Sequence, residues 1–340
     1  MASALDDLTS SDFYWNQSAH FRSHEDVMKD RVPTCALRNA ILRNRHLFKD
    51  KVVLEVGAGT GLFSMFAAKA GAKQVFAIEN SPMGYLTKEI VQKNGLDKVV
   101  TVVQEKCIDD VKLPVDKVDI IISDWVGYCV VQDSKISAVL KARDKWLADD
   151  GLMFPDRVHL YVCGMEDAQY RADKIDWWED VYGYDMSNIS DIALGEPVVD
   201  SVQSDNVVTG DFLVQTYDLR NMKVEDFSWE SAFSLTANRR DTCHALLFWM
   251  SIEFSMCHSP IYVNAGPEGQ WTRWKQTIFY LDESVALQKD EALTGVVQFK
   301  ALGANLAEHA VTVRLTGGPS NTKKELVQEF RLRSWDTKEK

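Results

Sequence analysis

The first half of the chain alternates between short apolar runs and segments with the apolar spacing of a helix. Strand-like runs occupy residues 51–56, 74–78, 99–104 and 118–123, and helical spacing marks residues 62–70, 82–93 and 134–147. Strands separated by helices of about ten residues are typical of βαβ units, whose strands form a parallel sheet. We expect a helical segment over residues 10–48 to precede this sheet.

The pattern changes near residue 155, and we expect a linker over residues 153–156. Short strand-like runs bounded by turn residues then occupy residues 158–163, 209–219, 232–235, 245–254, 277–280, 295–300 and 311–315. Since most of these runs have no helical segment between them, they predict an antiparallel barrel or sandwich. Residues 167–192 are the exception, because they are helical in pattern and rich in aromatic side chains.

The composition is that of an ordinary soluble globular protein. The 340 residues are 46% hydrophobic and 26% charged, which excludes disorder for the bulk of the chain. The longest apolar runs, residues 120–122 and 245–250, fall far short of the ~18 residues that a membrane span needs, so we expect no membrane partner. The N-terminal residues lack the apolar core of a signal peptide. We therefore expect a cytoplasmic protein, with the nucleus as a second location.

The chain is acidic, with 50 acidic against 38 basic residues and a formal charge of −12. This balance argues against nucleic acid as a direct partner, because phosphate binding needs basic patches. It permits a basic protein partner, although solubility alone also explains it. The six cysteines show neither a C-x-x-C pair nor zinc-binding spacing, so we expect reduced thiols and no metal site.

A glycine-rich turn after the first predicted strand is the strongest candidate for ligand binding. Gly57, Gly59 and Gly61 would let the backbone turn sharply and approach a ligand closely. Glu79, at the end of the second strand, is placed to accept both hydroxyls of a ribose. Two plainer interpretations stay open: an ordinary tight turn, and an acid that favours the N-terminus of the following helix.

The spacing of the glycines in this turn favours one class of nucleoside ligand over others. The pattern Gly-x-Gly-x-Gly differs from the dinucleotide fingerprint, and the turn carries no phosphate-binding lysine. It therefore fits a phosphate-free nucleoside better than NAD or ATP, and S-adenosylmethionine is the natural candidate. Asp109, just past the third strand, could receive the adenine amino group, although a solvent-exposed loop acid is an equal alternative.

The chain resembles a type I protein arginine methyltransferase over residues 12–335, most closely at residues 55–71, 117–125, 143–157 and 271–281. The resemblance implies an α/β plus β fold of three parts: an N-terminal helical cover segment (1–48), a Rossmann-like methyltransferase domain (49–154) and a β-barrel domain (155–340). Residues 167–192 would form a helical arm that docks on a partner subunit. Its expected interface residues are Tyr170, Trp177, Trp178, Tyr182, Tyr184 and Met186, unless they pack internally as a helical hairpin.

The resemblance also implies a chemistry, which is methyl transfer from S-adenosylmethionine to a guanidine nitrogen. In this family two glutamates neutralise and orient the substrate guanidinium. A Thr-His-Trp loop of the barrel closes the site, an aromatic helix covers the cofactor, and an arginine binds the methionine carboxylate.

This chain departs from the family at nearly every one of those positions. Aspartates, Asp124 and Asp133, stand where the glutamates are expected, and Lys135 replaces a methionine beside the substrate. A misplacement of about 1 Å can cost about 10²-fold in rate. The loop histidine is Arg273, which is always charged. Arg273 could pair with Asp30 or Asp133 as a built-in mimic of the substrate.

The cofactor side departs as well. Ser18 replaces a tyrosine of the cover helix, and Pro33 stands where the carboxylate-binding arginine is expected. Losing a charged hydrogen bond costs about 1.5–3 kcal/mol. Glu55, Gly57, Gly59, Gly61 and Glu79 remain, so a vestigial nucleoside pocket with weak or lost cofactor binding is predicted.

These departures together predict a catalytically inactive paralogue. It would act as the regulatory, activating subunit of a hetero-oligomer with an active arginine methyltransferase, and it would meet arginine-rich substrates only indirectly. Two alternatives stay open: an active methyltransferase with an altered site, and a non-catalytic binding module for arginine-rich proteins.

Overall fold

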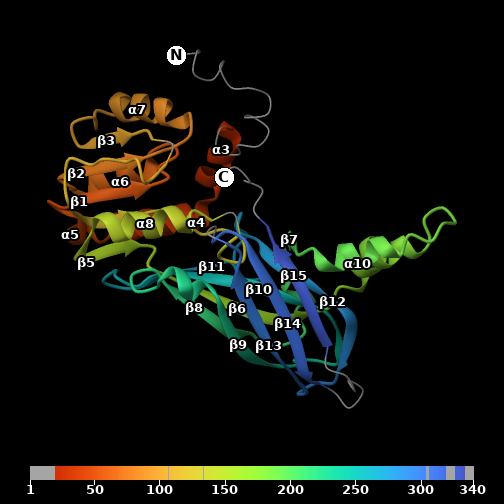
Figure 1. Cartoon of the computed structure of the whole chain (residues 1–340). Helices are drawn as coiled ribbons and strands as arrows, with labels where there is room; N and C mark the ends of the chain where they lie inside the picture. The colour runs from red at the N-terminus through yellow and green to blue at the C-terminus, as the bar shows by residue number, and fades with distance from the viewer. Residues whose placement is uncertain (1–19, 106, 133, 304–305, 319–325, 334–340) are drawn as a thin grey trace.

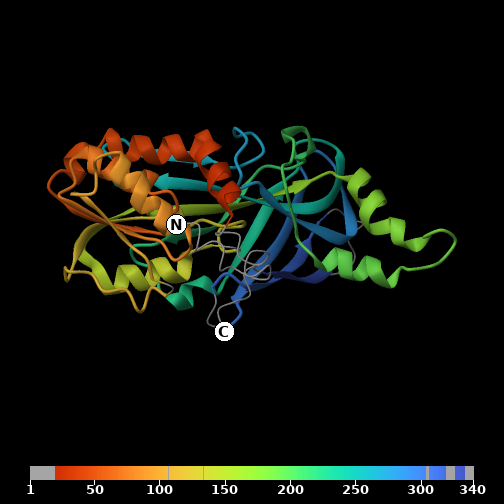
Figure 2. The same ribbon diagram turned by 90° about the horizontal axis from the view of Figure 1, so that it is seen from above.

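The computed structural model describes residues 20–105, 107–132, 134–303, 306–318 and 326–333. An α/β body built from the first half of the chain lies beside a longer β body built from the second half (Figure 1). A narrow helical arm projects from the far side of the β body, and the view from above shows the same arrangement (Figure 2). No helix within the described ranges is long and apolar enough to cross a membrane.

The α/β body contains a five-stranded parallel sheet in the order β3-β2-β1-β4-β5. Its strands are β1 (Val52–Val56), β2 (Gln74–Ile78), β3 (Val100–Val103), β4 (Val118–Ile122) and β5 (Leu147–Phe154). The first four strands are those that the apolar runs predict. The sequence does not predict β5, because Asp149 and Asp150 interrupt its apolar residues where the edge of the sheet is exposed.

Helices cover this sheet and precede it. They are α3 (Phe21–Lys29), α4 (Arg31–Leu42), α5 (Arg45–Phe48), α6 (Leu62–Ala70), α7 (Met83–Lys93) and α8 (Ile136–Trp146). The helical segment expected before the sheet is therefore present over residues 21–48, and residues 10–19 lie outside the described residues. Pro33 is buried in the first turn of α4, where a missing backbone N–H breaks no helical hydrogen bond.

The β body is antiparallel and consists of two sheets. One sheet has the order β7-β12-β10-β6-β8 with β11 added beside β10, and the other has the order β15-β14-β13-β9. The strands are β6 (Arg157–Met165), β7 (Val198–Asp200), β8 (Phe212–Asp218), β9 (Trp229–Thr236), β10 (Asp241–Phe254), β11 (Ile261–Asn264), β12 (Gln276–Leu287), β13 (Ala292–Ala301), β14 (His309–Gly317) and β15 (Leu326–Leu332). Single turns of 3-10 helix lie at Ser204–Asn206 and Val224–Phe227.

Aromatic rings fill the space between the two sheets. Phe248 of β10 packs against Phe279 of β12 and Phe299 of β13, and Phe279 in turn contacts Phe330 of β15. All four side chains are fully buried. The two sheets therefore share one core, and the predicted fold class, a Rossmann-like domain with a β-barrel domain, is confirmed.

The two bodies meet at the short link between β5 and β6. Only Pro155 and Asp156 separate these strands, which is shorter than the expected linker. Phe154 of β5 packs between Phe48 of α5 and Phe254 of β10. The joint is thus a packed interface rather than a free connection, and it fixes the loops of both bodies relative to each other.

The arm is built from the chain between β6 and β7. It consists of α9 (Ala168–Tyr170), a π-helical turn (Arg171–Ile175), a 3-10 turn (Asp176–Glu179) and α10 (Asn188–Gly195). The predicted helical character is confirmed, and the segment consists of two short limbs joined near Tyr182. Tyr182 and Gly183 turn the chain there with positive φ angles of 54° and 88°.

Candidate functional site

The glycine-rich turn adopts the geometry that its glycines predict. Gly57, Gly59 and Gly61 have φ angles of 73°, 53° and 77°, a region that side chains rarely occupy. The turn connects β1 to α6 at the carboxyl edge of the parallel sheet, where ligands of such folds bind. The turn therefore has both the conformation and the position expected of a nucleoside site.

The carboxylate of Glu79 faces this turn. One of its oxygens accepts the backbone N–H of Gly59 at 2.6 Å, and the other accepts the N–H of Ser81 at 2.9 Å. The side chain is buried at the end of β2. The structure thus brings Glu79 and Gly59 together as the sequence predicts, and the contact with a ribose stays a prediction.

Side chains of the chain itself lie on the turn. A Cβ atom built on Gly57 would lie 2.8 Å from both Cδ and Nζ of Lys135, and one built on Gly59 would lie 2.9 Å from Nδ1 of His24. The Lys135 ammonium also donates to the Gly57 carbonyl at 3.3 Å. The sequence alone did not indicate that Lys135 reaches this turn.

Glu55 points into the fold beneath the turn. Its carboxylate accepts the backbone N–H of Ser64 at 2.8 Å and also accepts the Ser64 hydroxyl. Burial raises the pKa of Glu55 to about 7, although the Ser64 hydrogen bonds and the Lys135 charge oppose the rise. This arrangement ties β1 to α6, and the predicted role of Glu55 in cofactor binding stays a prediction.

Asp109 lies on the exposed loop after β3. Its carboxylate forms an ion pair with Lys141 of α8 at 2.7 Å, which lowers the pKa of Asp109. The plainer of the two sequence interpretations, an exposed loop acid, accounts for this environment. A contact with adenine stays a prediction.

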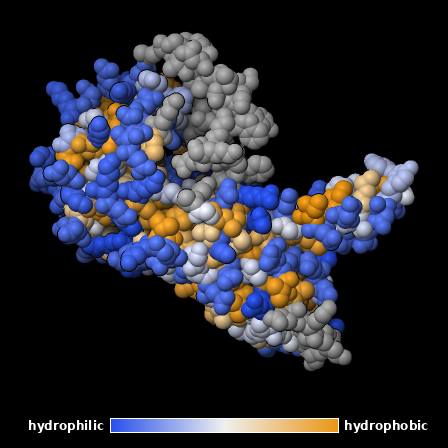
Figure 3. All heavy atoms as spheres, viewed as in Figure 1, coloured by the Kyte–Doolittle hydropathy of each residue, from blue (hydrophilic) through white to orange (hydrophobic). Residues whose placement is uncertain are grey.

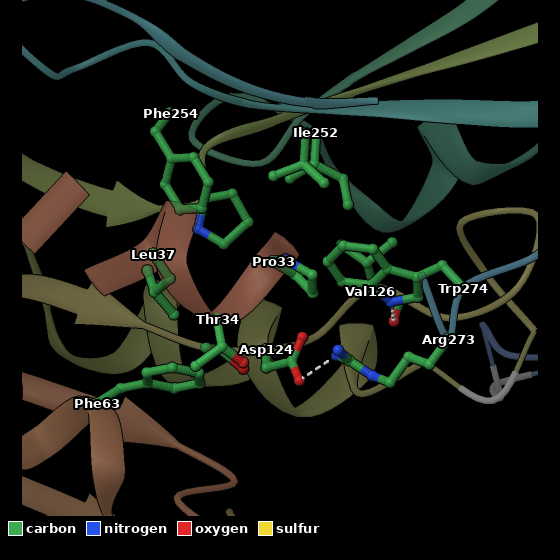
Figure 4. Close-up of a pocket in the computed structure, with 13 residues that line it drawn as sticks. Pro33, Thr34, Leu37, Phe63, Asp124, Val126, Ile252, Phe254, Arg273 and Trp274 are labelled. Atoms are coloured by element: carbon green, nitrogen blue, oxygen red, sulfur yellow. Dashed lines mark hydrogen bonds and ion pairs between the residues drawn. The ribbon is translucent and has the colours of Figure 1, made fainter. Parts of the chain in front are cut away.

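The second half of the site lies between the two bodies and is centred on Arg273. One guanidinium nitrogen contacts Asp124, just after β4, at 2.5 Å, and another lies 3.5 Å from Asp30, between α3 and α4. The backbone N–H of Arg273 donates to the same Asp30 oxygen at 2.8 Å. Figure 4 shows the guanidinium pointing directly at Asp124.

The surroundings hold Arg273 in this position. Its guanidinium lies 4.6 Å from the ring centroid of Trp274, and the Trp274 indole donates to the Val126 carbonyl at 2.9 Å. Asp30 is 4% exposed, and burial raises its pKa although Arg273 opposes the rise. A charge buried to this extent needs a partner, which Arg273 supplies.

The pairing with Asp30 is one that the sequence suggested, whereas the pairing with Asp124 is new. The alternative partner, Asp133, lies outside the described residues, as does Ser18 of the cover segment. Because Asp124 and Arg273 are 149 positions apart, only the three-dimensional structure brings them together. The sequence held one signal for this contact. Asp124 replaces a glutamate and Arg273 replaces a histidine, and the resemblance places both residues in the same pocket.

Little space remains beside Arg273. The cavity there measures about 20 Å³, which is enough for about one water molecule. Its lining, part of which Figure 4 labels, includes Pro33, Thr34 and Leu37 of α4, Phe63 of α6, and Asp124. The cavity therefore cannot admit an arginine side chain while Arg273 remains in place.

The residues fit one half of S-adenosylmethionine better than the other. The nucleoside half would meet three glycines with positive φ and the carboxylate of Glu79. Where the resemblance expects an arginine for the amino-acid half, the chain has Pro33, which has no hydrogen-bond donor, and the Lys135 side chain lies on Gly57. Among the described residues, no group of three His, Cys, Asp or Glu side chains could hold a metal ion.

The expected interface residues divide into two sets. Tyr182 is 94% exposed and Tyr184 is 70% exposed, and Trp177 is also exposed. Tyr170 instead stacks on Tyr280 of β12, with a centroid distance of 4.6 Å, which favours the internal-packing interpretation for this residue. Trp178 and Met186 are half-buried.

Two family models match the chain. Residues 53–151 match a methyltransferase domain, and residues 156–316 match an arginine methyltransferase oligomerization subdomain. Protein arginine N-methyltransferase 1 of Caenorhabditis elegans is 48% identical over 86% of this chain and 85% of its own length. Protein arginine N-methyltransferase 1 of Schizosaccharomyces pombe is 42% identical over 96% of each chain.

Solved structures agree with this result. A chain of the Trypanosoma brucei PRMT1 enzyme–prozyme heterotetrameric complex with AdoHcy superposes with a TM-score of 0.90 at 34% identity, over 94% of this chain and 100% of that chain. Arabidopsis thaliana protein arginine methyltransferase 10 superposes with a TM-score of 0.82 over 94% of this chain and 100% of that chain. At 22% identity the second likeness concerns the fold alone.

Proposed function

The chain belongs to the protein arginine N-methyltransferase family, and from this premise we propose that it is a regulatory subunit without methyl transfer of its own. In this proposal it assembles with a catalytically active member of the family. Arginine-rich proteins are then substrates of the complex, and this chain meets them only indirectly. We propose a cytoplasmic location, with the nucleus as a second one, and neither nucleic acid nor a membrane as a direct partner.

The observation that carries the proposal is the position of Arg273. A substrate guanidinium needs carboxylates to neutralise and orient it. Here the chain's own guanidinium is within 2.5 Å of Asp124 and 3.5 Å of Asp30. An incoming arginine would have to displace a competitor that is covalently part of the site and therefore always present at high effective concentration.

The cofactor side supports the same proposal. S-adenosylmethionine, when bound, would supply the methyl group. Glu79 would orient its ribose, and the glycine turn would let the backbone approach it. Pro33 leaves the methionine carboxylate without the bidentate arginine contact that such groups favour. We therefore propose weak cofactor binding by the isolated chain.

The arm supports the proposed assembly. Its exposed aromatic side chains are of the type that dominates protein interfaces. The matching family model is described as an oligomerization subdomain, and one structural neighbour is an enzyme–prozyme complex. We propose by analogy that an inactive subunit of this fold activates its partner by holding the partner's site in shape.

A second candidate function is an active arginine methyltransferase with an altered site. Three observations favour it. The chain is 48% identical to a relative that is named as a methyltransferase, its fold is intact, and it retains the glycine turn. It requires Arg273 to leave the pocket during each cycle and Asp124 to serve in place of a glutamate. The third possibility, a binding module for arginine-rich proteins, also requires a free acidic pocket, and Arg273 fills the one at this site.

A methylation assay of the purified full chain separates these candidates. With S-adenosylmethionine and an arginine-rich peptide, we expect no transfer above the protein-free background. Restoring both acids with Asp124→Glu and Asp133→Glu should not rescue it, because Arg273 and Pro33 remain. Robust turnover by the unmodified chain or by the double variant would overturn the proposal in favour of the second candidate.

A further inference from the structure

Lys135 is a charged residue of the glycine-turn site that the proposed function does not use. Its backbone N–H donates to the Trp125 carbonyl at 3.0 Å, which fixes the residue directly before α8. From there its side chain reaches the Gly57 carbonyl at 3.3 Å. Because its backbone is fixed, the ammonium stays within the reach of one side chain from the turn, even when it moves.

The ammonium lies on Gly57, two residues along the turn from the predicted ribose site at Gly59 and Glu79. Glu79, the predicted ribose acceptor, is hydrogen-bonded to Gly59, which is two residues from Gly57. Two residues span at most about 7 Å. In S-adenosyl compounds only one carbon separates the sulfur from the ribose ring. A ribose at Glu79 whose 5′ carbon points along the turn would bring the sulfur close to Gly57 and to Lys135.

The methyl donor and its product differ at that sulfur. S-adenosylmethionine carries a positive sulfonium, whereas S-adenosylhomocysteine carries a neutral thioether, and the two otherwise share the same nucleoside and amino acid. An ammonium and a sulfonium held at the same turn would repel each other, because like charges in a partly buried site are poorly screened by water. Moving Lys135 aside to admit the donor would give up its hydrogen bond to Gly57 and its attraction to the buried Glu55.

We propose that Lys135 makes the nucleoside site of this chain select the neutral S-adenosylhomocysteine over the cationic S-adenosylmethionine. The chain would then be loaded by the product of its partner's reaction rather than by the donor. The loading by a partner's product rests on the proposed function, whereas the selectivity itself rests on family membership and on the nucleoside site at Glu79. It does not require the chain to be inactive.

Calorimetric titration of the full chain with each compound in turn tests this, without any turnover. We expect the dissociation constant for S-adenosylhomocysteine to be at least tenfold lower than that for S-adenosylmethionine. Lys135→Met should bring the two constants within threefold, mainly by tightening donor binding. Lys135→Arg keeps the charge and should keep the preference.

Lys69→Met is the matched control, since it removes an exposed lysine from the last turn of α6 and should leave the ratio unchanged. A wild-type ratio near one, or a tenfold ratio that survives Lys135→Met, would contradict the proposal. Absence of binding of both compounds to both the wild type and Lys135→Met would also overturn it, because the nucleoside site would then not exist. All three outcomes are independent of the methylation assay.

Discussion

The arm differs from the cleft between the two bodies in how its key side chains are placed. Those of the cleft are paired, whereas those of the arm are exposed. In the cleft, the guanidinium of Arg273 is paired with both Asp30 and Asp124, and the remaining cavity is about 20 Å³. On the arm, Tyr182 and Tyr184 are exposed to solvent. Figure 3 also shows an apolar patch part-way along the arm. In the cleft, the carboxylates that could bind a guanidinium already contact Arg273. On the arm, the exposed aromatic side chains form a group of the kind that protein interfaces use.

The exposure of the arm is not a sign that the arm is loosely folded. The Trp178 indole donates to the Lys174 carbonyl at 3.0 Å, and the Ser190 hydroxyl donates to the Ile175 carbonyl at 2.8 Å. Tyr170 anchors the base of the arm on the β body through its stack with Tyr280. The arm thus holds its own shape and presents the remaining aromatic side chains outward.

Removing the aromatic side chains of the arm should produce the largest effect. We expect the wild type to form a dimer or larger assembly, and we expect the double variant Trp177→Ala, Trp178→Ala to be monomeric and to lose activation of an active partner. Light scattering after size-exclusion chromatography measures the association. A double variant that still associates and supports full partner activity would contradict the role of the arm.

Two further variants show whether the loss is specific to the arm. Tyr182→Ala removes the most exposed of its aromatic side chains without touching the contacts that fold it, and should weaken association measurably. Tyr262→Ala removes an exposed aromatic side chain of β11 on the β body, and should leave association unchanged. Equal effects of these two variants would mean that the arm is not the interface.

Neutralising the buried acid beneath the glycine turn should change stability with pH. The folded pKa of Glu55 is about 7, above its ordinary value of 4.5, so the folded state binds the proton more tightly. The free energy of unfolding therefore falls as pH rises through this window. We therefore compare the unfolding free energy of Glu55→Gln with that of the wild type at each pH. This difference should favour the variant by about 2–3 kcal/mol more at pH 8 than it does at pH 5.

Urea denaturation at the two pH values measures this difference. Glu225→Gln, at an exposed glutamate of the β body, is the matched control and should show no such dependence. A Glu55→Gln variant that is destabilised equally at both pH values would show that Glu55 is charged and well solvated, contrary to its place in the core.

Opening the paired cleft should have the smallest of the three effects. Arg273→Ala removes the side-chain partner of Asp30 and Asp124 but keeps the backbone N–H that also binds Asp30. We expect a loss of about 1–2 kcal/mol in the free energy of unfolding at pH 7, because the guanidinium is partly exposed. Lys275→Ala, in an exposed pair with Asp200, should cost less than about 0.5 kcal/mol. An Arg273→Ala variant as stable as Lys275→Ala would mean that the cleft is not held closed.

Much of the fold could be predicted because its elements carry strong periodic patterns. The helix α6 and the strand β2 have the bounds that the apolar spacing predicts. The strands β7 and β11 escaped prediction, because β7 has no fully buried residue and β11 has one, whereas the equally short β3 is an unbroken Val-Thr-Val-Val run. The strand β15 alternates clearly in burial, but its residue types do not follow the alternation, because Gln328 is polar and buried whereas Val327 is apolar and exposed.

The site was predictable in its parts, but among its contacts only the pairing of Arg273 with Asp30 was suggested by the sequence. The glycine turn and Glu79 are visible in the sequence because they keep a known local pattern. The substituted acids are visible because they depart from one. The contacts of Arg273 with Asp124 and of Lys135 with Gly57 join positions 149 and 78 residues apart. Such contacts depend on how the two bodies and their loops pack, which no local pattern encodes.

The central claim is that this chain contributes an interface and not a catalytic site. The most direct test is the methylation rate of its complex with an active family member when Asp124→Ala is placed in this chain alone. The account predicts an unchanged rate, and a complete loss when the partner's own catalytic acids are removed instead. A loss of activity caused by Asp124→Ala in this chain would contradict it.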